Sequence, residues 1–166
     1  HGHVIDLEYD SAGRLVTLRD PLDAPGHPRT VVLAYDVVGR IASITDFATE
    51  YGQGGSGRQV RYAYYGPGDE GGLPGDLKSV TYPAAPGFPD GKTWTYTYVT
   101  DAGDPALQHD LLAIVDGEGQ VIVANAYGKK ASDPLRLDRV VAQTLPNLGG
   151  SKMHFEYIPV FPMGSD

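Results

Sequence analysis

The chain has 166 residues, of which 41% are apolar, and it carries a formal net charge of −8. This apolar content argues against an intrinsically disordered chain. The 13 Lys and Arg residues are scattered singly, which argues against a nucleic-acid partner because phosphate binding needs clustered basic residues. No apolar run reaches the eighteen or so residues of a membrane span. There is no cysteine, so disulfides and thiolate metal sites are excluded.

One phrase occurs twice near the start of the chain. Residues 9–15 read Tyr-Asp-Ser-Ala-Gly-Arg-Leu, and residues 35–41 read Tyr-Asp-Val-Val-Gly-Arg-Ile. Later, degenerate copies align on a tyrosine, with successive spacings of 26, 29, 34, 29 and 30 residues. Regular spacing near 30 residues is typical of a repeat array. The aligned tyrosines are Tyr9, Tyr35, Tyr64, Tyr98, Tyr127 and Tyr157.

Alternating apolar or aromatic residues precede each aligned tyrosine, as in Val31, Leu33 and Tyr35. A period of two residues predicts half-buried β-strands. In the first two copies the aspartate after the tyrosine can accept a main-chain hydrogen bond two residues on, and the glycine suits the left-handed position of a bulged hairpin. The tyrosine therefore ends one strand, and the residues after Gly-Arg begin its antiparallel partner.

In the third to fifth copies longer loops replace this turn, at residues 66–75, 100–108 and 128–137. Returning strands are still expected after them, at 76–80, 110–114 and 139–142. Residues 116–119 form the tightest connection between repeats and are short enough for another hairpin. The nearest helical candidate, 104–115, contains a proline near its start and fits the repeat better as a strand.

The predicted fold class is therefore all-β, an antiparallel hairpin meander of about 30-residue repeats that forms an open, twisted or spiralling sheet. We expect residues 1–166 to be a single repeat array. Its repeats span about 3–28, 29–57, 58–91, 92–119 and 120–150, with a partial copy at 151–166.

The phrase Tyr-Asp-x-x-Gly-Arg-Leu, followed by an aliphatic strand and a Gly/Pro loop, resembles the YD repeat of the Rhs family over residues 3–158. Relatives of that family include the teneurins and the cocoon-forming subunits of insecticidal toxin complexes. The resemblance implies a β-sheet that spirals into a hollow shell, commonly around a toxic C-terminal region, in an extracellular or cell-surface protein. It also implies structural motif positions at Tyr9, Asp10, Gly13, Arg14, Leu15, Tyr35, Asp36, Gly39, Arg40 and Ile41.

The chain departs from the family pattern in two ways. Five and a half repeats are too few to close a shell, and the proline- and glycine-rich signature that ends an Rhs core is missing. We therefore expect a fragment of a larger protein, whose partners would be the remaining repeats of that protein or further copies of itself, with an enclosed toxin or a surface glycan as further candidates.

No catalytic pattern occurs, so we expect neither an enzyme nor a cofactor. None of the five histidines lies in an H-E-x-x-H motif. The acidic loops at 69–70, 101–104 and 116–118 could offer oxygen ligands to Ca²⁺, but they lack EF-hand spacing and favour solvated turn carboxylates. Residues 52–57 are glycine-rich without the Lys-Ser/Thr of a phosphate loop, which favours a flexible connector.

Three functions remain open. The first is a structural sheet segment with no catalysis of its own. The second is a subunit that joins head-to-tail into a filament through edge strands near residues 3–10 and 152–157. The third is carbohydrate binding or adhesion by exposed aromatic rings, the candidates being Tyr62, Tyr64, Trp94, Tyr96 and Tyr98.

Overall fold

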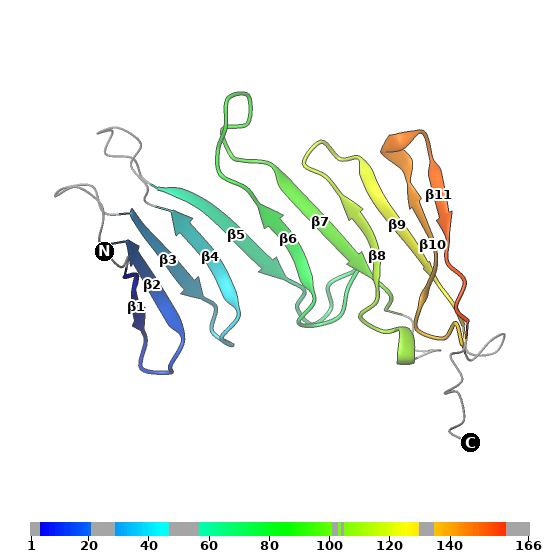
Figure 1. The fold of residues 1–166 in the computed structure, drawn as a ribbon, viewed down its shortest axis with the longest axis horizontal. Helices are drawn as coiled ribbons and strands as arrows, with labels where there is room; N and C mark the ends of the chain where they lie inside the picture. Colours follow the sequence, from blue (N-terminus) through cyan, green and yellow to red (C-terminus); the bar gives the residue numbers. More distant parts are fainter. Residues whose placement is uncertain are drawn as a thin grey trace, which may run out of the picture. The chain divides into compact units, whose positions relative to one another are not determined.

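The computed structural model describes residues 4–20, 29–46, 57–100, 103, 105–129 and 135–158. Within these residues, 11 antiparallel strands form one sheet in which the strand order is the chain order (Figure 1). Each strand is therefore hydrogen-bonded only to its neighbours in sequence, and β1 and β11 are the end strands. The expected all-β antiparallel meander is confirmed.

Among the described residues, five strands end at an aligned tyrosine: β1 (Asp6–Tyr9), β3 (Arg29–Tyr35), β5 (Arg58–Tyr64), β7 (Thr93–Tyr98) and β9 (Val121–Tyr127). Each is followed by a returning strand, by which we mean the strand after the tyrosine's loop. The returning strands are β2 (Leu15–Asp20), β4 (Ile41–Asp46), β6 (Leu77–Thr81), β8 (Leu111–Val115) and β10 (Val140–Leu145), and β11 (Ser151–His154) comes last. The alternating sequence pattern thus predicted where these strands end.

The described helices are two 3₁₀ turns, η2 (Pro105–Leu107) and η3 (Pro146–Leu148). Neither they nor any other described segment forms a helix long and apolar enough to cross a membrane. The η2 turn lies in the segment that had the nearest helical pattern, and β8 follows it as expected.

A β-bulge recurs at the tyrosine end of the hairpins. In the first, Glu8 faces Thr17 while Tyr9 faces Leu15, so one residue of the returning strand has no opposite partner. The same shift places Tyr35 opposite Ile41. It recurs between Tyr98 and Leu111, and between Tyr127 and Val140. A bulge of this kind bends the strand and re-aims the residues beside it.

The chain divides into two compact units, His1–Ala63 with Val80–Thr93, and Tyr64–Ser79 with Trp94–Asp166. Whether one continuous array spans residues 1–166 stays a prediction.

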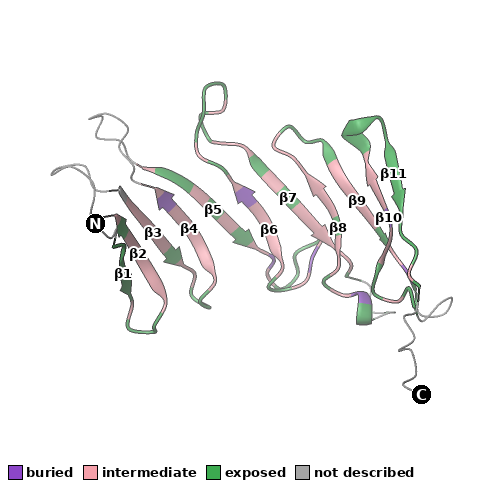
Figure 2. Cartoon of the chain, in the orientation of Figure 1, coloured by how far each residue is buried: buried purple, intermediate pink, exposed green. Residues whose placement is uncertain are grey.

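Few side chains are buried in either unit. Among the described residues the buried side chains are Tyr65, Val80, Leu107, Ala142 and Thr45. Most other strand residues are half-buried or exposed, which Figure 2 shows in pink and green. The strands are therefore held by ladder hydrogen bonds and by cross-strand side-chain contacts rather than by a deep core.

Candidate functional site

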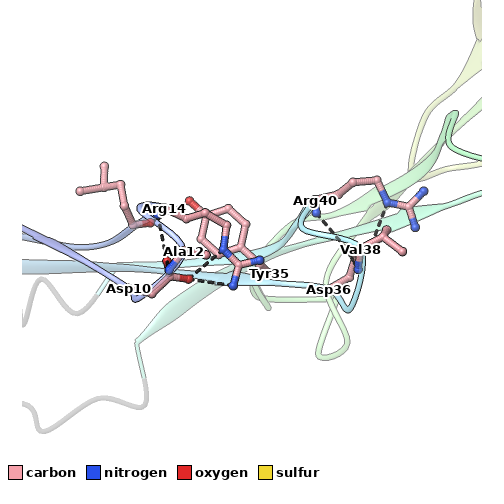
Figure 3. Close-up of polar contacts among 8 residues, drawn as sticks. Asp10, Ala12, Arg14, Tyr35, Asp36, Val38 and Arg40 are labelled. Atoms are coloured by element: carbon pink, nitrogen blue, oxygen red, sulfur yellow. Dashed lines mark hydrogen bonds and ion pairs between the residues drawn. The ribbon is translucent and has the colours of Figure 1, made fainter.

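The first motif turn is built around the Asp10 carboxylate (Figure 3). One of its oxygens accepts hydrogen bonds from the backbone N–H groups of Ala12 and Arg14, both at 2.9 Å. Its other oxygen accepts one from Arg14 Nε at 2.8 Å. Gly13 has φ of 77°, the left-handed conformation that glycine adopts readily. The expected turn chemistry is confirmed here.

The second motif turn repeats this geometry. The Asp36 carboxylate accepts hydrogen bonds from the backbone N–H groups of Val38 at 3.0 Å and Arg40 at 2.8 Å. Its second oxygen pairs with Arg40 Nε at 2.7 Å, and Gly39 has φ of 90°. Acid and base in the motif are therefore paired within their own turn.

These donors keep both carboxylates charged. The hydrogen bond from the Arg14 backbone, followed by that from its side chain, lowers the pKa of Asp10. Burial raises the pKa of Asp36, but the hydrogen bonds from Arg40 and Val38 outweigh it and the net pKa is lowered. A carboxylate that accepts several N–H bonds is stabilised in its ionised form.

A third turn of the same kind connects β8 to β9. The Asp116 carboxylate accepts hydrogen bonds from the backbone N–H groups of Glu118 and Gln120, both at 2.9 Å, and Gly119 has φ of 80°. The sequence analysis expected a tight connection here that is short enough for a hairpin, which the antiparallel pairing of β8 with β9 confirms, but it did not identify the aspartate turn. The same Asp-x-x-Gly spacing at 116–119 was the signal that identifies it.

Three aligned tyrosines, Tyr35, Tyr127 and Tyr157, bind the preceding hairpin through their hydroxyl groups. Tyr35 donates to the Leu15 carbonyl at 2.7 Å. Tyr127 donates to the Leu111 carbonyl, and Tyr157 to the Val140 carbonyl, both at 2.9 Å. Each acceptor is the first residue of a returning strand. We call this contact the inter-hairpin tyrosine bond.

Arginine side chains add a second contact to two of these bonds. The Arg14 guanidinium carbon lies 4.7 Å from the Tyr35 ring centroid, and Figure 3 shows the two side chains side by side. Arg139 lies 4.8 Å from the Tyr157 ring centroid. In each case the arginine directly precedes the residue whose carbonyl accepts the tyrosine hydroxyl. Cation–π contacts at such distances are attractive, so one arginine joins its own turn to the next hairpin.

A carboxyl group replaces this arginine before β8. Burial, and then the charge of Asp138 and a hydrogen bond with it, raise the pKa of Asp110 to about 6. The Oδ2 atom of Asp110 is buried without a hydrogen-bond partner. Burial and the charge of Asp110 also raise the pKa of Tyr127. Sequence reasoning missed this carboxyl pair, although the replacement of the motif arginine by aspartate was visible.

A second unpredicted pair joins two of the expanded loops. His109 Nδ1 lies 2.7 Å from Asp76 Oδ1, with His109 56% and Asp76 9% exposed at the side chain. An aspartate that orients a histidine also occurs in nucleophilic catalysis, where the histidine contacts a hydroxyl nucleophile. No hydroxyl among the described residues hydrogen bonds to His109. The pair therefore connects the loops after β5 and β7.

The candidate glycan-stacking residues are half-buried. Tyr62 and Tyr64 lie on β5, and the other three candidates, Trp94, Tyr96 and Tyr98, lie on β7. The Tyr98 ring packs edge-on against Tyr65 at a centroid distance of 6.2 Å, and the Tyr96 carbonyl accepts a hydrogen bond from the Tyr65 hydroxyl at 2.7 Å. Part of this aromatic set is thus engaged in its own unit, and glycan binding stays a prediction.

In the acidic loop at 69–70, Asp69 is paired with Lys78 Nζ at 3.0 Å. Three or more metal-ligating His, Cys, Asp or Glu side chains do not converge anywhere in the described part of the chain. Asp101 and Asp104 of the second acidic loop, the histidines His1, His3 and His27, and residues 52–56 of the glycine-rich segment lie outside the described residues. No family model matches the chain, and no curated protein matches it.

Proposed function

We propose that the chain is a structural β-sheet segment of a YD-repeat protein, with no catalytic role of its own. The supporting observation is that the distinctive side chains of the motif contact one another. Asp10 accepts hydrogen bonds from Arg14 within its turn, and Arg14 stacks on Tyr35 of the next hairpin. Groups engaged in this way hold hairpins in register.

The same contacts explain how such a segment extends. Each inter-hairpin tyrosine bond uses only a tyrosine at the end of one strand, or shortly after it for Tyr157, and a main-chain carbonyl at the start of the strand before it. Because the acceptor is main chain, the bond tolerates sequence change in the returning strand. A wall of any length can be assembled from hairpins that each contact only their neighbours.

The resemblance to the Rhs family supports the further proposal that this wall belongs to an extracellular or cell-surface shell, with cargo or lumen on one side and solvent on the other. Five and a half repeats would contribute one part of such a shell. The partners in this proposal are the neighbouring repeats of the parent protein.

Electron cryo-microscopy of the full-length parent protein tests the proposal. We expect further hairpins on both sides of this segment and a continuous wall that includes it. A parent protein in which the segment stands alone, with a sugar or another ligand against Trp94 and Tyr96, would contradict the structural role and favour recognition. Substituting Tyr35 and Tyr157 by Ala in the parent should open the wall to protease, whereas Arg58→Ala, at an exposed ion pair with Asp46, should not.

A further inference from the structure

The first aligned tyrosine differs from those that form inter-hairpin bonds. Tyr9 is 59% exposed, whereas Tyr35, Tyr127 and Tyr157 are half-buried. Neither the ring nor the hydroxyl of Tyr9 contacts a hydrogen-bond, ionic or aromatic partner within the described ranges. Yet Tyr9 occupies the same place as Tyr35, at the end of a strand and opposite the bulge of its own hairpin.

The apolar residues just before Tyr9, Leu7 on β1 and Ile5 directly ahead of it, show the same difference. Ile5 and Leu7 are 60% and 47% exposed, while Val31 and Leu33, at the matching positions before Tyr35, are half-buried. β3 lies between β2 and β4, whereas β2 is the one described strand beside β1. Among the described residues, Ile5, Leu7 and Tyr9 therefore have no returning strand on their outer side, whereas β3 has β2 there.

The established contacts define what would complete this edge. The neighbour of Tyr35 is a returning strand whose first residue, Leu15, presents its carbonyl and whose preceding residue, Arg14, presents a cation to the ring. Tyr157 has the same pair of contacts with Val140 and Arg139. Glu8 on β1 already lies 3.6 Å from Arg19 of β2, whereas the exposed Asp6 carboxylate also favours a basic neighbour, since opposite charges on adjacent strands attract.

We propose that the outer edge of β1 is a docking edge for one further hairpin of the Asp-x-x-Gly-Arg-aliphatic type. The returning strand of that hairpin pairs antiparallel with β1. Its first carbonyl accepts the Tyr9 hydroxyl, and its arginine stacks on the Tyr9 ring. This inference rests on the proposed structural function and names the chemistry of the next element in the wall.

A second folded copy of the chain does not offer this strand. In the described sheet every returning strand that follows an arginine, namely β2, β4 and β10, already lies between two neighbours. The end strands β1 and β11 are not returning strands, and Gly150 precedes β11. Head-to-tail joining of folded copies would therefore leave Tyr9 without its carbonyl and its cation.

The test adds the missing hairpin to the chain. A copy of residues 29–57, which carries the turn at Asp36 and the returning strand that follows Arg40, is fused ahead of Val4. Unfolding in urea is then measured for the unfused chain of 166 residues and for the fusion, in each case with Tyr9 and with Tyr9→Phe. In the fusion, Tyr9→Phe should lower the folding equilibrium constant about fivefold, the usual effect of one lost hydrogen bond. In the unfused chain, Tyr9→Phe should change the folding equilibrium constant less than about twofold.

Arg40→Ala in the added copy alone removes the stacked cation and should weaken the effect of Tyr9→Phe. Hydrogen exchange provides a second measurement that does not depend on comparing these variants. Docking of the added hairpin should protect the outer backbone amides of β1. The proposal would be overturned if Tyr9→Phe changed the folding equilibrium constant equally in the unfused chain and in the fusion, or if the β1 amides of the fusion stayed unprotected. The proposal would also be overturned, in favour of a second copy, if the unfused chain formed a dimer in light scattering and its β1 amides were protected from exchange in that dimer. None of these results decides whether the chain is part of a β-sheet wall. That proposal is tested separately by the structure of the full-length protein.

Discussion

At the scale of single residues, the motif glycine and the motif aspartate are required for different reasons. Gly39 has φ of 90°, a conformation that strains any residue with a Cβ atom. Asp36 is required for what its carboxylate accepts, two backbone N–H groups and the Arg40 side chain. The turn thus depends on backbone freedom at one position and on hydrogen-bond acceptance at another.

We predict that Gly39→Ala lowers the free energy of unfolding by about 1 kcal/mol, the usual cost of a side chain in the left-handed region. A Cβ at this position would lie 3.5 Å from the nearest Arg14 nitrogen, so the cost comes from the backbone and not from a clash. Urea denaturation measures it. Gly66→Ala is the matched control, because a Cβ there meets no atom within 4 Å and φ is not in the left-handed region. Equal losses for both variants would contradict this explanation.

The aspartates of the turns predict a loss of stability in acid. The pKa values of Asp10 and Asp36 are lowered below 3.8 in the folded chain. The contribution of these two aspartates to folding stability is therefore complete above pH 3.8. It is lost as the pH falls through the pKa values that they have in the folded chain. Asp36→Ala should lower the thermal midpoint at pH 7 and much less at pH 2. Asp46→Ala, which breaks an exposed ion pair with Arg58, should have a smaller effect at pH 7.

For Asp110 we predict the opposite pH dependence of folding stability, a loss as the pH rises. Its folded pKa of about 6 lies above the ordinary value of 3.8, so between these values the folded state binds more protons than the unfolded state. The stability from this group is fully present below pH 3.8 and is lost as the pH rises through 6. Asp110→Asn should flatten the fall in stability between pH 4 and 6, and Asp138→Asn should move it to lower pH. Asp90→Asn, at an exposed loop position, should leave the profile unchanged.

At the scale of strands and hairpins, the bulge and the tyrosine act together. In four hairpins the bulge pairs the aligned tyrosine, Tyr9, Tyr35, Tyr98 or Tyr127, with the first residue of its own returning strand. The carbonyl of that first residue then accepts the hydroxyl of the next aligned tyrosine, as Leu15 does from Tyr35. An irregularity in one hairpin thus provides the attachment point for the following one.

Tyr35→Phe should therefore lower the free energy of unfolding by about 1 kcal/mol, because the Leu15 carbonyl loses its donor while the ring still fits. Tyr127→Phe and Tyr157→Phe should have similar effects. Tyr9→Phe serves as the internal control, since Tyr9 is 59% exposed and should lose little. The four variants are compared by urea denaturation. A neutral Tyr35→Phe would show that the inter-hairpin bond contributes no net stability.

Sequence periodicity could predict the strands because alternation and turn chemistry are local. The strands that end at Tyr35 and Tyr127 and the turn at Asp36 follow from residues within a few positions of each other. The inter-hairpin bond joins residues 20 positions apart in Tyr35 and Leu15, and its acceptor is main chain, which leaves no trace in the sequence. The contact of Asp110 with Asp138 likewise depends on how two long loops close.

At the scale of the whole chain, the lack of a deep core changes how stability is distributed. Each strand is hydrogen-bonded only to its neighbours in sequence, and few described side chains are buried. In such an array stability is a sum of local and nearest-neighbour contributions, as in repeat proteins. A local defect should then remain local, whereas a protein with one shared core would lose stability throughout.

Hydrogen exchange of the Gly39→Ala variant tests this distribution. We expect faster exchange of backbone amides in β3 and β4, which flank the altered turn, and unchanged exchange in β9 and β10, because no hydrogen-bonded ladder joins these strands to it directly. The reciprocal variant, Tyr157→Phe, removes the bond to the Val140 carbonyl and should speed exchange near β10 and β11 while leaving β3 unchanged. Faster exchange in all strands of either variant would mean that the chain unfolds as one cooperative unit, and stability would then have to be assigned to the sheet as a whole and not to its hairpins.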